Sequence, residues 1–299
     1  MREAIRGYTD AVLEEAAGAG RLGAVAEGAA ALGELLGSSE ELRDVLSDQG
    51  VPTQVRRAVL ADLLRDRVER DVVRLVLHAV EHDRASELSG DVLWVAARAA
   101  AVRDSRRESG PTTLGRHAAL ERSAGYATAV LEGLGVDTLS EVEDQLFRFE
   151  RAIDASAELA AALTSRELPA EVRSGVVSDL LADRALEPTS RLATYLTRIG
   201  RPRDYVELLR ALVERVGEEA DRRVAVVRCA VALSSDQEAR LAAALSPAGG
   251  PPVDVRVIVD PSVLGGFVAT IGDTVVDASV RHRLDLLRER LTLPEATTN

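Results

Sequence analysis

Lysine is absent from this 299-residue sequence and cysteine occurs once, so all 37 basic residues are arginines. The single cysteine, Cys229, excludes an intrachain disulfide and favours a reducing compartment. The Gly265-Gly266 pair is not followed by the Gly-Lys-Ser/Thr pattern of a phosphate-binding loop. We therefore interpret this pair as a place where the backbone turns.

Long apolar runs are also missing. None approaches the ~18 uncharged residues that a membrane helix needs, and the first residues show no apolar signal region. The 49 acidic residues give a net charge of -12, which makes the chain a poor ligand for nucleic acid or anionic lipid. We expect no nucleic-acid partner and no direct membrane insertion, so a role at a membrane would require another subunit as the anchor.

Helical periodicity dominates what is present. Residues 1 to about 102 and residues 118 to about 222 each place apolar positions three and four apart, with breaks at glycine and proline. Each stretch predicts about six helices, which are too short to be stable alone and are expected to pack into a bundle. The charged segment 103–117 contains Gly110-Pro111 and is interpreted as a linker.

The two helical stretches repeat each other at an offset of 117 or 118 residues. The segment from Gly7 to Glu14 returns as Gly125 to Glu132, and the pattern that begins at Pro52 returns at Pro169. Three further matches begin at Glu41, Asp62 and Arg74. Five matches in register favour an internal duplication of a helical domain.

From Arg223 onward the pattern becomes that of strands. Residues 224–233 and 253–259 predict strands on either side of a helix capped by Ser234, and 267–271 with 274–278 predict a hairpin around Gly272-Asp273. Ser279 is expected to cap a last helix at 280–291. The predicted fold is mainly α with a small α+β C-terminal domain. It comprises two tandem six-helix bundles at 1–114 and 115–222, followed by a mixed sheet packed with two helices at 223–299.

The C-terminal segment carries a signature in three pieces: Asp260-x-Ser-Val-Leu-Gly-Gly266, Gly272-Asp273 and Asp277-x-Ser-Val-Arg-x-Arg-Leu284. In order and spacing it resembles the delta subunit of F-type ATP synthases, called the oligomycin-sensitivity-conferring protein in mitochondria. Thr270 and Ala278 depart from the usual residues of that family. Residues 118–291 resemble an ordinary delta subunit from end to end, and the extra helical copy resembles the longer delta subunits of actinobacteria.

This resemblance implies a non-catalytic subunit of the peripheral stalk, the stator that keeps the catalytic alpha/beta head from turning with the rotor. In the family, the helical domain holds N-terminal helices of alpha subunits, and the C-terminal domain meets the b-type stalk subunit. The implied location is peripheral, at the cytoplasmic face of the bacterial cell membrane, within the complex. No cofactor is implied.

The family also suggests where an alpha-subunit helix would bind, because the first and fifth helices of its helical domain line a groove. Such grooves take apolar anchors at helical spacing, so we expect apolar burial to dominate. The other interpretation is that most of these residues form the core of the bundle. In the second copy the groove residues map to Tyr126, Ala127, Val130, Leu131, Leu192, Tyr195, Leu196 and Ile199.

Two alternatives come from other classes of protein. His78-x-x-Glu81-His82 spells an inverted zinc-peptidase motif, in which both histidines share a helix face and Glu81 acts as the base. The repeat argues against it, because Tyr195 and Ile199 stand at the equivalents of the two histidines. A helical RNA-binding module is the second alternative, which the acidic balance disfavours. We predict no catalytic residues and no metal site.

Overall fold

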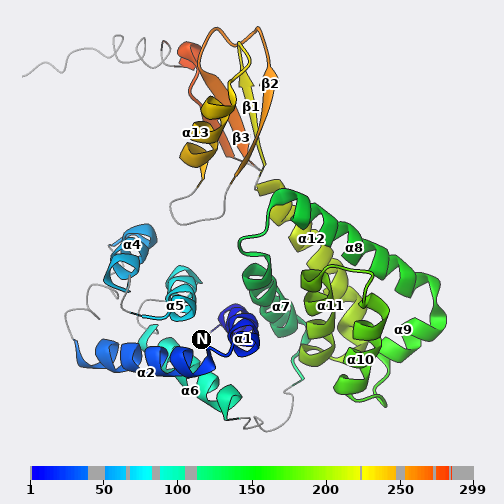
Figure 1. Cartoon of the computed structure of the whole chain (residues 1–299). Helices are drawn as coiled ribbons and strands as arrows, with labels where there is room; N and C mark the ends of the chain where they lie inside the picture. Colours follow the sequence, from blue (N-terminus) through cyan, green and yellow to red (C-terminus); the bar gives the residue numbers. More distant parts are fainter. Residues whose placement is uncertain are drawn as a thin grey trace, which may run out of the picture. The chain divides into compact units, whose positions relative to one another are not determined.

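The computed structural model describes residues 2–39, 51–64, 68–82, 88–104, 113–222, 224–246, 253–271, 274–282 and 284 (Figure 1). The chain divides into two compact units, Met1–Leu131 with Asp144–Val213 and Glu132–Glu143 with Glu214–Asn299. None of the helices among the described residues is both long enough and apolar enough to span a bilayer. The boundaries expected at residues 114 and 222 stay predictions.

The first helical copy consists of helices that each bury one apolar side. Helix α2 packs against α6 so closely that a Cβ atom on Gly33 would lie 2.5 Å from Leu93 Cδ2. The described helices of this copy are α1 (Glu3–Gly18), α2 (Leu22–Ser38), α4 (Thr53–Leu64), α5 (Arg70–His82) and α6 (Leu88–Arg103). The apolar stripe of α1 is buried, and it comprises Ile5, Tyr8, Val12 and Leu13.

The second helical copy has the six helices that the sequence predicts. They are α7 (Arg116–Leu131), α8 (Val136–Ala155), α9 (Ala157–Thr164), α10 (Ala170–Leu181), α11 (Glu187–Ile199) and α12 (Tyr205–Arg222). The buried hydroxyl of Tyr205 donates to the Ala193 carbonyl at 3.1 Å and so ties α12 to α11. Arg210 Nε donates to Glu150 Oε1 at 2.7 Å and ties α12 to α8.

The C-terminal sheet contains β1 (Val224–Cys229), β2 (Asp254–Val259), β3 (Phe267–Ile271) and β4 (Thr274–Asp277) in the order β2-β1-β3-β4. Strands β1 and β2 are parallel and are joined through α13 (Ser235–Leu245), whereas the other pairs are antiparallel. Ser234 caps α13 in a reciprocal capping box with Gln237. The core of the sheet lies on the α13 side and contains Ala225, Val227, Val253 and Ala269 with Leu241 and Leu245.

The predicted fold class is confirmed, with two qualifications in the C-terminal unit. Strand β1 ends at Cys229 rather than at residue 233, because residues 230–233 leave the sheet to bring Ser234 to the start of α13. Ser279 Oγ accepts a hydrogen bond from the His282 amide at 3.2 Å, as expected of a helix cap. The Gly272-Asp273 turn and most of the predicted last helix lie outside the described residues.

Candidate functional site

The residues expected to line a partner-binding groove come together on α7 and α11. All eight side chains are between 0% and 8% exposed, so very little of this surface of the second copy is accessible to solvent. The rings of Tyr126 and Tyr195 stack at its centre, with centroids 3.7 Å apart and planes 9° from parallel. We call this surface the α7/α11 face; it comprises Tyr126, Ala127, Val130, Leu131, Leu192, Tyr195, Leu196 and Ile199.

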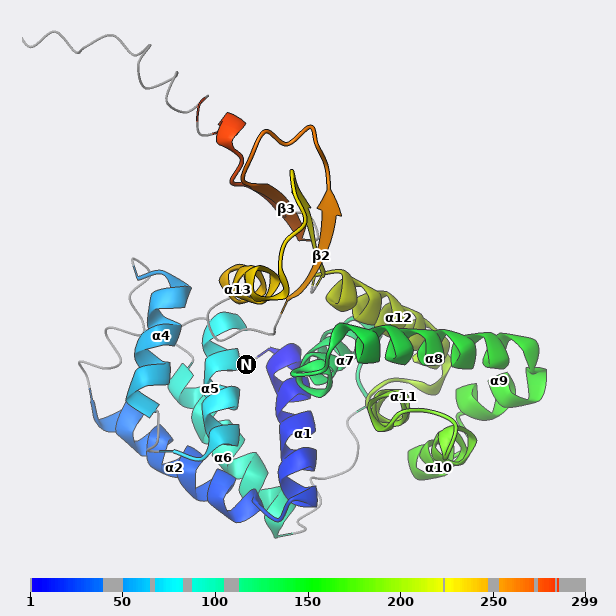
Figure 2. The same cartoon turned by 45° about the horizontal axis from the view of Figure 1, so that its top comes forward.

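Helix α1 of the first copy covers part of the α7/α11 face. It lies beside α7 in both views (Figure 1, Figure 2). Both stacked tyrosines donate their hydroxyls to it, Tyr195 to Asp10 Oδ2 at 2.7 Å and Tyr126 to Glu14 Oε2. Desolvation, together with these carboxylates, raises the pKa of both phenols, so both hydroxyls keep their protons at neutral pH. The polar ends of the two rings are therefore satisfied by α1.

Two glycines at equivalent positions of the repeat let α1 and α7 approach each other. A Cβ atom on Gly7 would lie 1.9 Å from the carbonyl oxygen of Arg122, and one on Gly125 would lie 1.8 Å from that of Ala4. Neither distance is compatible with a side chain. The glycines stand 118 residues apart in sequence and make the same contact in each direction, so the two copies meet through a pseudo-two-fold helix pair.

Charged groups surround this crossing point. Arg122 lies 2.6 Å from Glu3 and 3.4 Å from Asp10, and Arg98 of α6 also lies 3.4 Å from Asp10. Burial raises the pKa of Asp10, and its hydrogen bonds and the two arginines oppose that shift. One carboxylate is thus held by both copies, which makes Asp10 the electrostatic centre of the contact.

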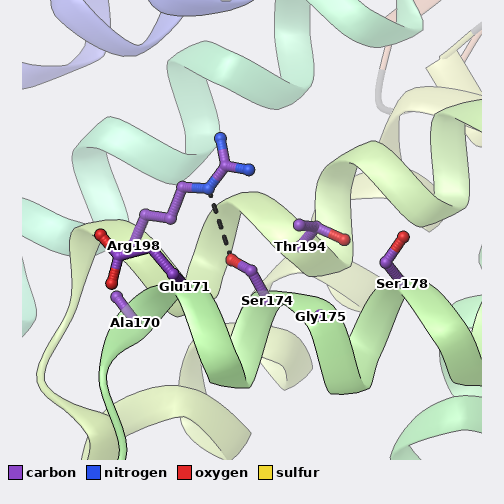
Figure 3. Close-up of a pocket in the computed structure, with 7 residues that line it drawn as sticks. All are labelled: Ala170, Glu171, Ser174, Gly175, Ser178, Thr194 and Arg198. Atoms are coloured by element: carbon purple, nitrogen blue, oxygen red, sulfur yellow. Dashed lines mark hydrogen bonds between the residues drawn. The ribbon is translucent and has the colours of Figure 1, made fainter.

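Two hollows flank α11 where α1 leaves it uncovered. The first, of about 530 Å³, is lined by Glu14, Tyr126, Arg191, Thr194 and Tyr195 among others. The second, of about 510 Å³, lies between α10 and α11 and shares Thr194, Ser178 and Arg198 with the first. Figure 3 shows Arg198 reaching over this second hollow, where its Nε donates to Ser174 Oγ at 3.4 Å. In the first copy, the positions of Ser174 and Arg198 hold the ion pair Arg57–Glu81 instead.

The histidine motif of the first copy has a packing role. His78 is 6% exposed, and its ring lies between those of Tyr8 and His82, at centroid distances of 3.8 and 4.1 Å. The two histidine rings stack, so their nitrogens do not converge on one metal position. Glu81 forms an ion pair with Arg57. The zinc-peptidase interpretation therefore finds no support. The Tyr8–His78 stack is the repeat counterpart of Tyr126–Tyr195.

The C-terminal unit has a mixed sheet face opposite α13. The strand register places Val226, Ile258, Val268 and Val275 on that face, and Val275 is 63% exposed. The exposed residues Arg228, Arg256 and Thr270 lie between them. Before β3, Gly265 and Gly266 have φ of 148° and 75°, the positive values that favour glycine. The pair lies in the connection between β2 and β3 and ends it directly before Phe267.

Sequence reasoning missed the residues through which α1 contacts the second copy. These residues are Gly7, Asp10, Glu14 and Arg122, none of which was predicted to be a contact between the copies. A signal for Gly7 was present, because Gly-Tyr stands at equivalent places in both copies and neither glycine is needed for a helix to form. Nothing comparable marked Asp10 or Arg122, whose repeat counterparts are Thr128 and Ala4.

Two helical copies that meet through α1 and α7, followed by a four-stranded sheet whose outer face carries exposed valine and isoleucine side chains, define a protein-binding scaffold. Within the described residues, no three His, Cys, Asp or Glu side chains gather closely enough to hold a metal ion. The sequence model of the ATP synthase delta (OSCP) subunit matches residues 5–104 and 123–291 of this chain.

Individual relatives agree with that match. "ATP synthase subunit delta" of a Parafrankia species is 35% identical over 262 residues, covering 88% of this chain and 84% of the relative. The protein of that name from Frankia casuarinae is 35% identical over 294 residues, 96% of each chain. That from Streptomyces lividans is 42% identical over 153 residues, 51% of this chain and 56% of the relative. The chain belongs to the ATP synthase delta (OSCP) subunit family. The resemblance is confirmed: the chain is a non-catalytic peripheral-stalk subunit of an F-type ATP synthase.

Proposed function

We propose that this chain joins the catalytic alpha/beta head to the b-type stalk subunit, at the cytoplasmic face of the cell membrane, by holding alpha N-terminal helices with its helical part. The observation that carries this proposal is the family match over both helical copies and the sheet. A stator junction must stay closed under torque. Nanomolar binding requires about 12 kcal/mol, and one exposed ion pair contributes under about 1 kcal/mol, so extended apolar burial has to supply most of it.

Affinity purification of the full chain from cells that also express the alpha, beta and b-type subunits tests the proposal. We expect alpha and b-type subunits to be recovered together with the chain. Recovery of neither subunit under conditions that keep the rest of the complex assembled would show that the chain has another role.

The outer face of the sheet is the proposed contact for the b-type subunit. Val275→Asp adds a charge to the most exposed apolar residue of that face, and we expect at least a tenfold loss of b-type recovery with alpha recovery unchanged. The control is Thr274→Asp, which adds the same charge to the same strand but on the opposite side. Equal loss with both variants would place the contact elsewhere.

The hollow beside the α7/α11 face is the proposed entry for an alpha helix. A charge placed on the face itself, as in Tyr195→Asp, would not test this entry cleanly. The new carboxylate would be buried next to Asp10 and would also disturb the contact with α1. Thr194→Trp instead fills the hollow that Thr194 lines. We expect at least a tenfold weaker affinity for an alpha N-terminal peptide by calorimetry, with Thr194→Val behaving like the unmodified chain. Unchanged affinity in Thr194→Trp would rule out this entry.

A further inference from the structure

Helix α1 makes contacts on two opposite sides. One side buries Ile5, Tyr8, Val12 and Leu13, and the stack of Tyr8 on His78 ties it to α5 of its own copy. The other side carries Glu3, Gly7, Asp10, Ala11 and Glu14, positions three and four apart that form one stripe along the helix. This second stripe is the one that touches the second copy.

The contacts of this stripe resemble those of a helix ligand in its receptor. Gly7 marks the crossing point with α7. The carboxylates of Asp10 and Glu14 accept hydrogen bonds from the two tyrosine hydroxyls of the α7/α11 face. Arg191 Nη2 donates to the Ala11 carbonyl at 3.2 Å, and Arg198 lies 3.4 Å from Glu14. Each polar group at the rim of the face that contacts α1 thus meets a complementary group.

We propose that α1 is a built-in competitor that occupies the binding site of a partner helix on the α7/α11 face. The face selects helices with a small residue at the crossing point and carboxylates three and seven residues later, which is the pattern of Gly7, Asp10 and Glu14. This inference rests on the proposed function, in which a partner helix enters at the hollow beside that face. It adds that the partner helix presents a small residue and two carboxylates, and that this helix must displace α1.

The chemistry of the contact allows exchange. The side of α1 that faces the second copy is small and charged, whereas its apolar side stays with its own bundle, so α1 keeps the core of its own copy when the two copies separate. The segment between Arg103 and Arg116 joins the copies, and α1 therefore remains tethered after release. A short tether gives a millimolar effective concentration, which a free helix has to overcome. A weakened α1 contact consequently raises the apparent affinity for a helix supplied in trans.

The full-length chain carrying Gly7→Ala tests this competition. The added methyl would lie 1.9 Å from a backbone oxygen of α7, so it pushes α1 away without changing the α7/α11 face. The matched control is Gly23→Ala, where a Cβ atom meets nothing within 4 Å. The probe is a fluorescein-labelled peptide of residues 2–20, followed by anisotropy. We expect at least tenfold tighter binding to Gly7→Ala than to the unmodified chain or the control, and no binding of a peptide that itself carries Gly7→Ala.

A second variant guards against misfolding of the first. Glu3→Gln with Glu14→Gln removes two carboxylates of α1 without adding volume, and a gain of about three- to tenfold is expected, with circular dichroism unchanged. Equal affinity of the probe for the unmodified chain and both variants overturns the inference.

An alpha N-terminal peptide separates this inference from the proposed function. If it binds the unmodified chain and Gly7→Ala equally well, the competition is refuted while alpha binding stands. If it binds neither chain and the residue 2–20 probe still prefers Gly7→Ala, the competition holds and the alpha subunit is not the partner. Tighter binding of both peptides to Gly7→Ala supports both.

Discussion

Alanine in place of Gly266 is expected to make Cys229 react with a thiol reagent about 100-fold faster. Gly266 has a φ of 75°, which costs a non-glycine residue about 1–2 kcal/mol. A Cβ atom there would also lie 2.3 Å from the Ala278 carbonyl oxygen, part of the backbone that follows β4. Overpacking of this kind costs about 1–3 kcal/mol. A combined loss of about 3 kcal/mol corresponds to roughly a 100-fold rise in the open population.

Cys229 is a suitable reporter because it is the sole cysteine, 3% exposed, and lies on the inner side of β1. Its labelling rate measures local opening of the sheet when closing is faster than reaction. Gly133→Ala is the control, since that glycine has a φ of 79° but an open space around it and lies between α7 and α8. We expect it to leave the Cys229 rate unchanged. A rate within threefold of the unmodified chain for Gly266→Ala would mean that the turn tolerates a side chain.

Local rules in the sequence were sufficient for most of the fold. Strand β3 has the predicted bounds, because its apolar residues are enclosed by glycines on both sides. Ser234 caps α13 as expected, and the stripe from Ile5 to Leu13 is buried. In each case the signal lies within a few residues, and tertiary packing reinforces it.

The placement of α1 on the α7/α11 face could not be predicted in this way. Periodicity shows which side of a helix is apolar, but it does not show which helix the polar side meets. The contact depends on pairs distant in sequence, such as Asp10 with Tyr195 and Glu3 with Arg122. Each of these residues is an ordinary surface type for a helix. The eight residues of the α7/α11 face were named from the family resemblance, which brings the first and fifth helices of the copy together, while their neighbour α1 was assigned to its own bundle alone.

Acid is expected to weaken the first helical copy through His78. Burial, aided by the nearby His82 and Arg57, lowers the pKa of His78 from 6.5 to about 3. Its Nε2 is buried without a hydrogen-bond partner. Below about pH 6.5 the unfolded chain therefore binds a proton that the folded chain does not, and stability falls as the pH falls. Each pH unit costs about 1.36 kcal/mol, which amounts to about 2.7 kcal/mol between about pH 6.5 and pH 4.5.

His78→Phe removes this titration while keeping a ring between Tyr8 and His82, as the repeat does with Tyr195. We expect the variant to be at least as stable as the unmodified chain at about pH 7.5, and about 2–3 kcal/mol more stable near pH 4.5. Urea unfolding followed by Trp94, the sole tryptophan and a residue of α6 in the same copy, provides the measurement. The control is His117→Phe, since the His117 side chain is 90% exposed and its loss should leave the pH dependence unchanged. Parallel stability curves for His78→Phe and the unmodified chain would show that His78 is protonated in the folded state as readily as in the unfolded one.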